Sequence, residues 1–280
     1  MPDAPPDYVR TGRAFDAVAA SYDAIYGPDG NAIMAWMRAE SLAVLSETFP
    51  PGSRLLEIGC GTGEEALYLA ERGRSVLATD LSPAMAARTL AKAQVAGSGG
   101  RVAAVALPAR HLEALRPAKG DLFDGAYASF GALNCEPDMR PVMAALAGLL
   151  KPHSAFVCSV MARCCPFEIA WYLAHGHPGR AVRRFRGWQL APVSGAGIGA
   201  WVGVRYLRSR DILAACPDPA SFGLEMLMSL PLLLPPPYLD ELFRRRPEFF
   251  RRMEDWERRL RKRKPWCEWG DHILLVLRRG

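Results

Sequence analysis

Short apolar runs alternate with segments of helical periodicity along the first 161 residues. The runs are typical of buried strands and cover residues 53–59, 75–80, 101–107, 122–130 and 154–161. Between them, apolar positions recur at helical spacing in segments 64–71, 84–96, 110–115 and 139–150. Ser82 suits an N-cap and Pro83 suits the first helical position, so the helix that follows has the best-defined start. Repeated strand, helix, strand units predict an α/β, doubly wound parallel sheet covered on both faces.

The pattern changes after Met161. Residues 162–204 hold tryptophans, histidines, arginines and a glycine-rich stretch without a clean period, which indicates an insertion or lid. A helix is expected at 209–215 and two further strands at 221–230 and 272–279. Between these strands the chain turns through prolines and becomes amphipathic, and the predicted buried side of that helix carries Phe250, Met253, Trp256 and Leu260. The expected organisation is a core at 1–161, a lid at 162–208 and the rest of the core at 209–280, interrupted by a basic helical insertion at 231–265.

Composition narrows the class of protein. Half of the 280 residues are hydrophobic, and no tract of about 18 apolar residues occurs, which is typical of a globular chain rather than a membrane-spanning one. The first residues carry prolines and acids where a secretory signal needs basic and apolar regions, so we expect a cytoplasmic protein. The seven cysteines lack the paired spacing of structural zinc sites, so we expect free thiols and no metal.

The net charge of +6 comes from one segment. Residues 244–264 contain eleven Arg or Lys against four Asp or Glu, which leaves 24 basic and 25 acidic residues in the rest of the chain. The simplest interpretation is a helix that exposes its arginines to solvent. Two alternatives stay open: the segment binds a nucleic-acid substrate, or it makes peripheral contact with an anionic membrane and receives a lipid-like substrate.

A glycine turn joins the first strand to the first helix in the stretch LLEIGCGTGEEALYLA, residues 55–70. Gly59, Gly61 and Gly63 permit a ligand to approach the backbone closely. Glu64 stands where the dinucleotide fingerprint has its third glycine, and a carboxylate there is a poor neighbour for a pyrophosphate. Glu57, before the turn, favours a ligand with a positive end. These features favour a cationic nucleoside without phosphate, as S-adenosylmethionine is.

The same residues carry a family resemblance. LLEIGCGTG resembles the first motif of class I S-adenosylmethionine-dependent methyltransferases, and ATDLSPAMAARTLAKA, residues 78–93, resembles their second strand and helix. The likeness covers about residues 12–161 and the two final strands, and it is strongest to the ubiquinone and menaquinone biosynthesis group. It implies a Rossmann-like, seven-stranded doubly wound sheet, mostly parallel with an antiparallel last strand, and an inserted lid.

The resemblance also implies cofactor contacts. The glycines and Cys60 would admit the cofactor, Glu57 would act on its ammonium, and Asp80 would accept both ribose hydroxyls. Leu81 would pack on the adenine. The residues expected to bind S-adenosylmethionine are Glu57, Gly59, Cys60, Gly61, Gly63, Asp80, Leu81, Ser129 and Phe130. The sequence departs from the family at residues 107–110, where no carboxylate is available for the adenine amine.

Methyl transfer from a sulfonium is a displacement that depends mainly on in-line alignment, so a general base is optional. Four residues are candidates for the base or for covering the methyl donor: His175 and His177 in the expected lid, and Tyr22 and Tyr26 upstream. A surface or capping role is the simpler explanation for the two histidines, whereas anchoring to the core explains the two tyrosines as well as a role over the cofactor does. We expect a small-molecule acceptor of quinone-like, lipid-like or natural-product type. The alternatives are nucleic-acid methylation through residues 244–264 and a cofactor-binding protein with other chemistry or a regulatory role; the acceptor atom and oligomeric state stay open.

Overall fold

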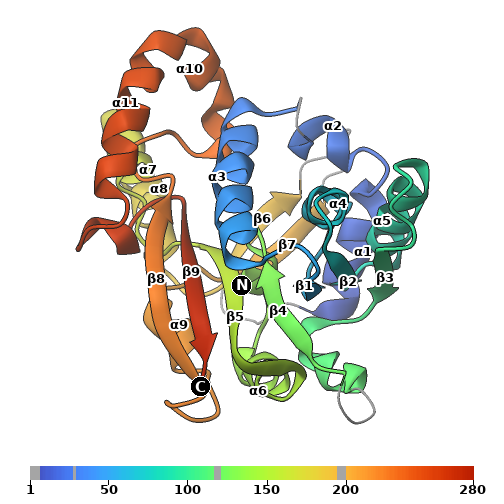
Figure 1. Ribbon diagram of the computed structural model, residues 1–280. Helices are drawn as coiled ribbons and strands as arrows, with labels where there is room; N and C mark the ends of the chain where they lie inside the picture. Colours follow the sequence, from blue (N-terminus) through green and yellow to red (C-terminus); the bar gives the residue numbers. More distant parts are fainter. Residues whose placement is uncertain (1–6, 28–29, 117–120, 194–199) are drawn as a thin grey trace.

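A computed structural model describes residues 7–27, 30–116, 121–193 and 200–280. Its centre is a seven-stranded sheet in the order β3-β2-β1-β4-β5-β9-β8 (Figure 1). Strands β1 to β5 pair in parallel, whereas β9 runs antiparallel to both of its neighbours. The predicted doubly wound sheet with an antiparallel last strand is therefore confirmed. The strands are β1 (Arg54–Ile58), β2 (Ser75–Asp80), β3 (Val102–Ala106), β4 (Phe123–Ala128), β5 (Leu150–Met161), β8 (Phe222–Leu230) and β9 (His272–Arg279).

Helices cover both faces of the sheet and bury two apolar cores against it. One core lies under α3 (Ala32–Thr48) and α4 (Glu64–Glu71), and the other under α6 (Met139–Leu149), α9 (Ser209–Leu213) and the 3₁₀ turn η1 (Ala109–Leu115). Helix α5 (Pro83–Val95) packs beside β3. Its N-cap is Ser82 as predicted, because the Ser82 hydroxyl accepts a hydrogen bond from the Met85 amide at 3.1 Å. All nine helical and strand segments predicted up to residue 161 are present.

The chain on either side of the core forms a cover at the carboxyl edge of the sheet. The N-terminal helices are α1 (Tyr8–Val18) and α2 (Tyr22–Tyr26). The segment after β5 contains α7 (Pro166–Ala174), α8 (Pro178–Ala181) and the turn η3 (Arg183–Phe185). A two-stranded hairpin, β6 (Gln189–Val193) and β7 (Ala200–Val204), packs against α1 and was not predicted. The glycine-rich part of the expected lid, residues 194–199, lies outside the described residues.

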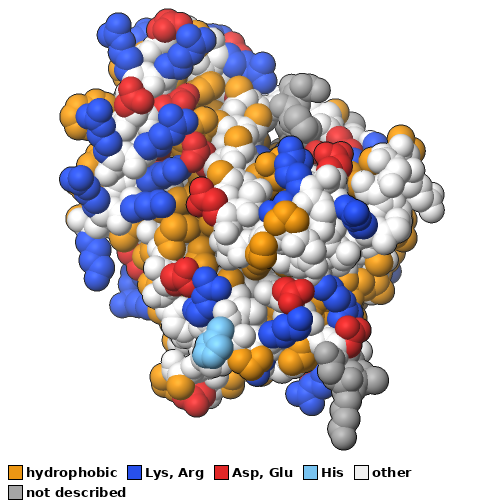
Figure 2. Space-filling view, viewed as in Figure 1, with side chains coloured by type: hydrophobic (Ala, Val, Ile, Leu, Met, Phe, Trp, Pro, Cys, Tyr) orange, Lys and Arg blue, Asp and Glu red, His pale blue; other side chains and the backbone are white. Residues whose placement is uncertain are grey.

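The basic segment forms a protruding arm. It contains η4 (Pro237–Leu239), α10 (Asp240–Arg245) and α11 (Pro247–Leu260), and Lys and Arg side chains gather over α10 and α11 (Figures 1 and 2). The predicted buried side of this helix is wrong at one position, since Trp256 is 58% exposed while Glu257 is fully buried. The Glu257 carboxylate accepts the amides of Leu232 and Leu233 at 2.7 and 2.6 Å, and this requirement sets the rotation of α11. None of the described helices is long and apolar enough to cross a membrane.

Candidate active site

The three glycines of the turn after β1 have different surroundings and therefore different roles. All three have positive φ, at 70°, 52° and 84° for Gly59, Gly61 and Gly63. A Cβ on Gly59 would stand 2.3 Å from the Ala132 side chain, and one on Gly63 would stand 2.6 Å from the Thr89 side chain. A Cβ on Gly61 would meet only Tyr22, at 3.9 Å. Gly59 and Gly63 therefore permit close packing within the protein, and Gly61 is the glycine that faces open space.

A pocket opens beside this turn at the carboxyl edge of the sheet. It encloses about 1060 Å³ of empty space, open solvent at its mouth included. Eight residues singled out in the sequence line it: Tyr22, Gly59, Cys60, Gly61, Asp80, Leu81, Ser129 and Phe130. Glu57, Gly63 and Tyr26 do not line this pocket, although Glu57 and Gly63 flank the turn. His175 and His177 are exposed around the C-terminal end of α7, and the structure does not bring them to the pocket.

Asp80 ends β2 on the pocket wall with its carboxylate oriented by backbone donors. One oxygen accepts the Gly61 amide and the other the Ser82 amide, each at 2.8 Å. Burial raises the pKa of Asp80 to about 6, while these amide bonds oppose the rise. A carboxylate has about four acceptor sites, so two remain for neighbouring hydroxyl groups. Such a carboxylate fits a ribose.

Glu57 is a buried acceptor behind the turn. Its side chain is 1% exposed, and its Oε2 has no hydrogen-bond partner among the described residues. Burial and the nearby Glu65 carboxylate raise the pKa of Glu57 well above its ordinary value. The Tyr127 hydroxyl lies beside this carboxyl group and opposes the rise of its pKa. An unpartnered buried acceptor is costly unless a donor reaches it, so a ligand amine would contact Glu57 through water.

The N-terminal helices close one side of the pocket. Asp23 of α2 accepts the Thr62 hydroxyl of the glycine turn and pairs with Lys92 of α5 at 3.2 Å, which fixes Tyr22 over Gly61. Arg38 of α3 also lines the pocket; it binds the Glu65 carboxylate at 2.7 Å and the Tyr26 carbonyl at 2.8 Å. Sequence reasoning missed Arg38, although an arginine on the apolar side of a helix is a visible signal.

A carboxylate also lies on the wall opposite the glycine turn, where the sequence offered none. Leu107 and Ala109 line the pocket there, and Glu136 lines it too, brought in by the connection between β4 and α6. Glu136 is 4% exposed and accepts the Tyr8 hydroxyl of α1. Burial raises its pKa. Local sequence inspection could not find this residue, because it reaches the wall through tertiary structure.

Phe130 adopts an unusual backbone conformation at the end of β4. Its φ is 50°, and its amide donates to the Ser159 hydroxyl at 2.7 Å. The Arg38 guanidinium lies 5.5 Å from the ring centroid, and the His272 ring centroid lies 6.3 Å from it in a T-shaped arrangement. Non-glycine residues at positive φ cost energy and often occur at functional sites.

Comparison with known proteins identifies the fold and the domain. Residues 55–153 match a family model described as a methyltransferase domain. No curated protein sequence matches the chain.

Three solved structures share the fold. The (4+2)-cyclase SpnF is 17% identical with a TM-score of 0.60, covering 100% of this chain and 98% of its own. The 1,6-didemethyltoxoflavin-N1-methyltransferase of Burkholderia thailandensis, with bound 1,6-didemethyltoxoflavin and S-adenosylhomocysteine, is 19% identical with a TM-score of 0.55, covering 100% and 92%. The N-methyltransferase NodS of Bradyrhizobium japonicum WM9, in complex with S-adenosylhomocysteine, is 15% identical with a TM-score of 0.55, covering 97% and 99%.

Proposed function

We propose that the chain, whose residues 55–153 match a methyltransferase domain, is a class I S-adenosylmethionine-dependent methyltransferase that methylates a small-molecule acceptor. The observation that carries the proposal is the pocket beside the glycine turn, which Gly61, the Asp80 carboxylate and the Phe130 side chain line together. A concave site with a few oriented polar groups is typical of small-molecule binding.

The residues of the pocket fit S-adenosylmethionine, which supplies an electrophilic methyl group when bound. Asp80 would accept the ribose hydroxyls with the acceptor sites that Gly61 and Ser82 leave open. Glu57 lies behind the turn and not on the pocket wall, so it would act on the ammonium end through water. Leu81 would pack against the adenine, and Glu136 could accept the adenine amine in place of a carboxylate at 107–110.

The acceptor would lie near Phe130, where Phe15, Tyr22 and Arg38 also line the pocket. Aromatic and arginine side chains of this kind suit a flat or conjugated metabolite. Among the described residues no group of three or more His, Cys, Asp or Glu side chains could hold a metal ion. The chain's contribution to rate would come from alignment of the acceptor with the methyl group.

Calorimetric titration with S-adenosylmethionine and S-adenosylhomocysteine tests the cofactor site in wild type, Asp80→Ala and Asp218→Ala. Asp218 is a matched control, because its carboxylate accepts the amide two residues further on, as that of Asp80 does, but at the exposed surface. We expect binding to wild type and Asp218→Ala, and its loss in Asp80→Ala. A folded wild type that binds neither compound would overturn the proposal.

The acceptor class is tested by release of S-adenosylhomocysteine during incubation with a panel of phenols, hydroxyquinones, carboxylic acids, amines, thiols and transfer RNA. Release with a small molecule supports the proposal, and release with RNA alone contradicts it. Binding of the cofactor with conversion of a substrate but no S-adenosylhomocysteine release would indicate other chemistry on this fold.

A further inference from the structure

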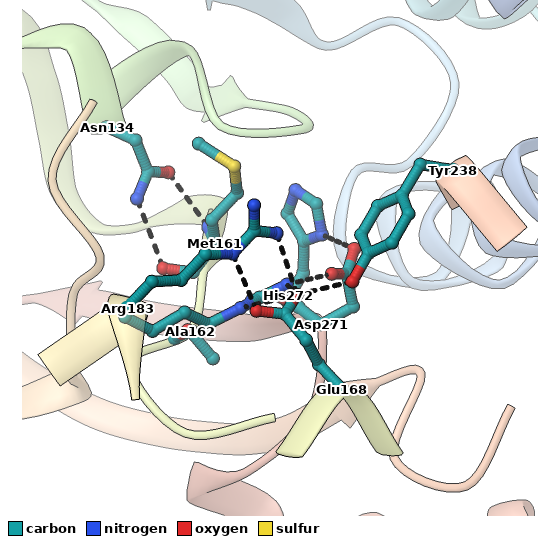
Figure 3. Close-up of polar contacts among 9 residues, drawn as sticks. Asn134, Met161, Ala162, Glu168, Arg183, Tyr238, Asp271 and His272 are labelled. Carbon is teal, nitrogen blue, oxygen red and sulfur yellow. Dashed lines mark hydrogen bonds and ion pairs between the residues drawn. The ribbon is translucent and has the colours of Figure 1, made fainter. Parts of the chain in front are cut away.

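A buried cluster of charged side chains joins the segment after β5 to the start of β9 (Figure 3). Arg184 of η3 is 4% exposed and binds Glu168 of α7 at 2.7 Å and Asp271 at 2.5 Å. Its remaining donors reach the carbonyls of Ala162 and Asp271 at 3.1 and 2.8 Å. Every hydrogen-bond partner of Arg184 is therefore a carboxylate or a carbonyl, and its ion pair holds the Asp271 carboxylate in position.

Asp271 in turn orients His272. The His272 Nδ1 lies 2.9 Å from the second oxygen of the Asp271 carboxylate. Burial alone would raise the pKa of Asp271, but the Arg184 charge and the His272 contact hold this pKa below its usual value. An ionised carboxylate accepts a proton donor, so the neutral imidazole carries its proton on Nδ1 and keeps a lone pair on Nε2.

His272 stands at the carboxyl edge of the sheet, beside Phe130 of the pocket wall, and does not itself line the pocket. It is the first residue of β9 and pairs with Met161 of β5 and Leu230 of β8. Its ring edge meets Phe130, which lines the pocket. In Figure 3 the second ring nitrogen points away from Asp271. No described residue is a hydrogen-bond partner of Nε2.

We propose that His272 is the general base of the reaction, that Asp271 is its positioning residue, and that the acceptor atom is the oxygen of a hydroxyl group. This inference rests on the proposed function and names its substrate class. The acceptor O–H gives its proton to His272 Nε2 while its oxygen bonds to the methyl carbon. The carbon–sulfur bond breaks, its electron pair stays on sulfur, and the proton later leaves His272 for solvent. A hydroxyl nucleophile needs such a base, whereas an amine or thiolate does not.

The groups around His272 agree with this role. Asp271 and Glu168 are carboxylates, and Arg184 neutralises part of their charge. The Tyr238 hydroxyl of η4 donates to Glu168 at 2.8 Å, and Arg183 binds the same carboxylate at 2.9 Å. From α3, Arg38 reaches the other side of the Phe130 ring. The charge of Arg38 is balanced by its ion pair with Glu65 at 2.7 Å.

The first test needs no acceptor. Diethyl pyrocarbonate acylates accessible, unprotonated imidazole nitrogens, and peptide mass spectrometry reports the modified residue. Exposed His111 serves as the internal control. We expect His272 to be modified in the wild-type protein, more slowly than His111, and the Asp271→Asn variant to show a changed rate at His272 alone. An unreactive His272 beside a modified His111 would overturn the proposal.

The second test uses the acceptor found by S-adenosylhomocysteine release. His272→Gln should lower kcat by about a hundredfold or more, with the cofactor Kd unchanged, and His111→Gln should behave as wild type. Asp271→Asn should lower kcat less and alter the acid side of the pH profile. A His272→Gln enzyme with wild-type kcat would overturn the assignment of His272 as the general base. A wild-type enzyme that methylates only amines or thiols would overturn it too. Failure of wild type to bind cofactor overturns the proposed function instead.

Discussion

The raised pKa of Asp80 predicts that cofactor affinity depends on pH. In the folded protein without ligand this pKa is about 6, mainly because the carboxyl group is buried. Ribose hydroxyls donate to the ionised carboxylate, so binding draws on the ionised fraction. Above pH 7 nearly all Asp80 is ionised, and at pH 5 about one molecule in ten is. We therefore expect affinity for S-adenosylhomocysteine to fall about tenfold, or about 1.4 kcal/mol, between pH 7.5 and pH 5.

Calorimetry at half-unit intervals measures this dependence, and repeating each titration in two buffers of different ionisation enthalpy counts the protons released on binding. Asp80→Asn keeps the size of the side chain and loses its charge, so its weak binding should not vary with pH through Asp80. Asp218→Asn is the surface control. A wild-type affinity that is constant within twofold from pH 7.5 to pH 5, in protein shown to be folded, would refute the reasoning.

Glu57 is the competing source of a pH effect, since burial also raises its pKa. The two carboxyl groups are separated by a second variant. If Asp80 is responsible, Glu57→Gln retains the slope below pH 6 and Asp80→Asn loses it. The reverse pattern would assign the titration to Glu57.

The raised pKa of Asp80 also makes the stability of the protein without ligand depend on pH. The pKa of Asp80 is 3.8 in the unfolded reference and about 6 in the fold, so the folded state holds the proton more tightly. This contribution to stability is present below pH 3.8 and is lost as pH rises through 6. The shift of about two pKa units corresponds to about 3 kcal/mol of stability that is lost as pH rises from 3.8 through 6. Urea unfolding of wild type and Asp80→Asn against pH should show the difference changing between pH 4 and pH 6.5.

Three further outcomes follow from packing. Gly61→Ala should fold but bind cofactor at least about tenfold more weakly, because its Cβ would enter the pocket. Gly59→Ala should lower the free energy of unfolding by about 1–3 kcal/mol through overpacking. Calorimetry measures the first effect and urea unfolding the second. Arg184→Met leaves the buried Asp271 carboxylate without a guanidinium partner and should lower the free energy of unfolding, measured in urea, by about 3–5 kcal/mol. Phe250→Ala should lower the free energy of unfolding by about 3–5 kcal/mol, whereas Trp256→Ala should change it by no more than about 0.5 kcal/mol. Equal changes in melting temperature for the two variants would contradict the rotation of α11.

The sheet could be predicted because its signals are local. Apolar runs end at Gly59 and Asp80, and Ser82 with Pro83 marks a helix start, so element type follows from a few neighbouring residues. The hairpin β6 and β7 escaped prediction because its strands are short and alternate poorly. Trp256 was misplaced because helical spacing alone cannot decide between an apolar side chain and a buried carboxylate that caps a distant turn.

The residues of the candidate site also differ in whether a local sequence signal marks them. Asp80, Leu81 and the turn glycines lie next to motif positions, so the pattern named them. Arg38, Glu136 and His272 come from segments far apart in the sequence, and only the tertiary structure places them around Phe130 and the pocket. The resemblance to the quinone biosynthesis group, the cytoplasmic location and the roles of individual site residues stay predictions.

The pairing of Arg184 with Glu168 and Asp271 limits how the enzyme can exchange its ligands. Swinging the segment after β5 away from β9 would break the contacts of Arg184 with both carboxylates and with two carbonyls together. The N-terminal helices are attached by contacts that are at most partly buried, since Asp16 binds the hydroxyl of Ser82 and the amide of Ala84, and Asp23 binds Thr62 and Lys92. Departure of the demethylated product is therefore expected to follow motion of α1 and α2, with the rest of the cover staying in place.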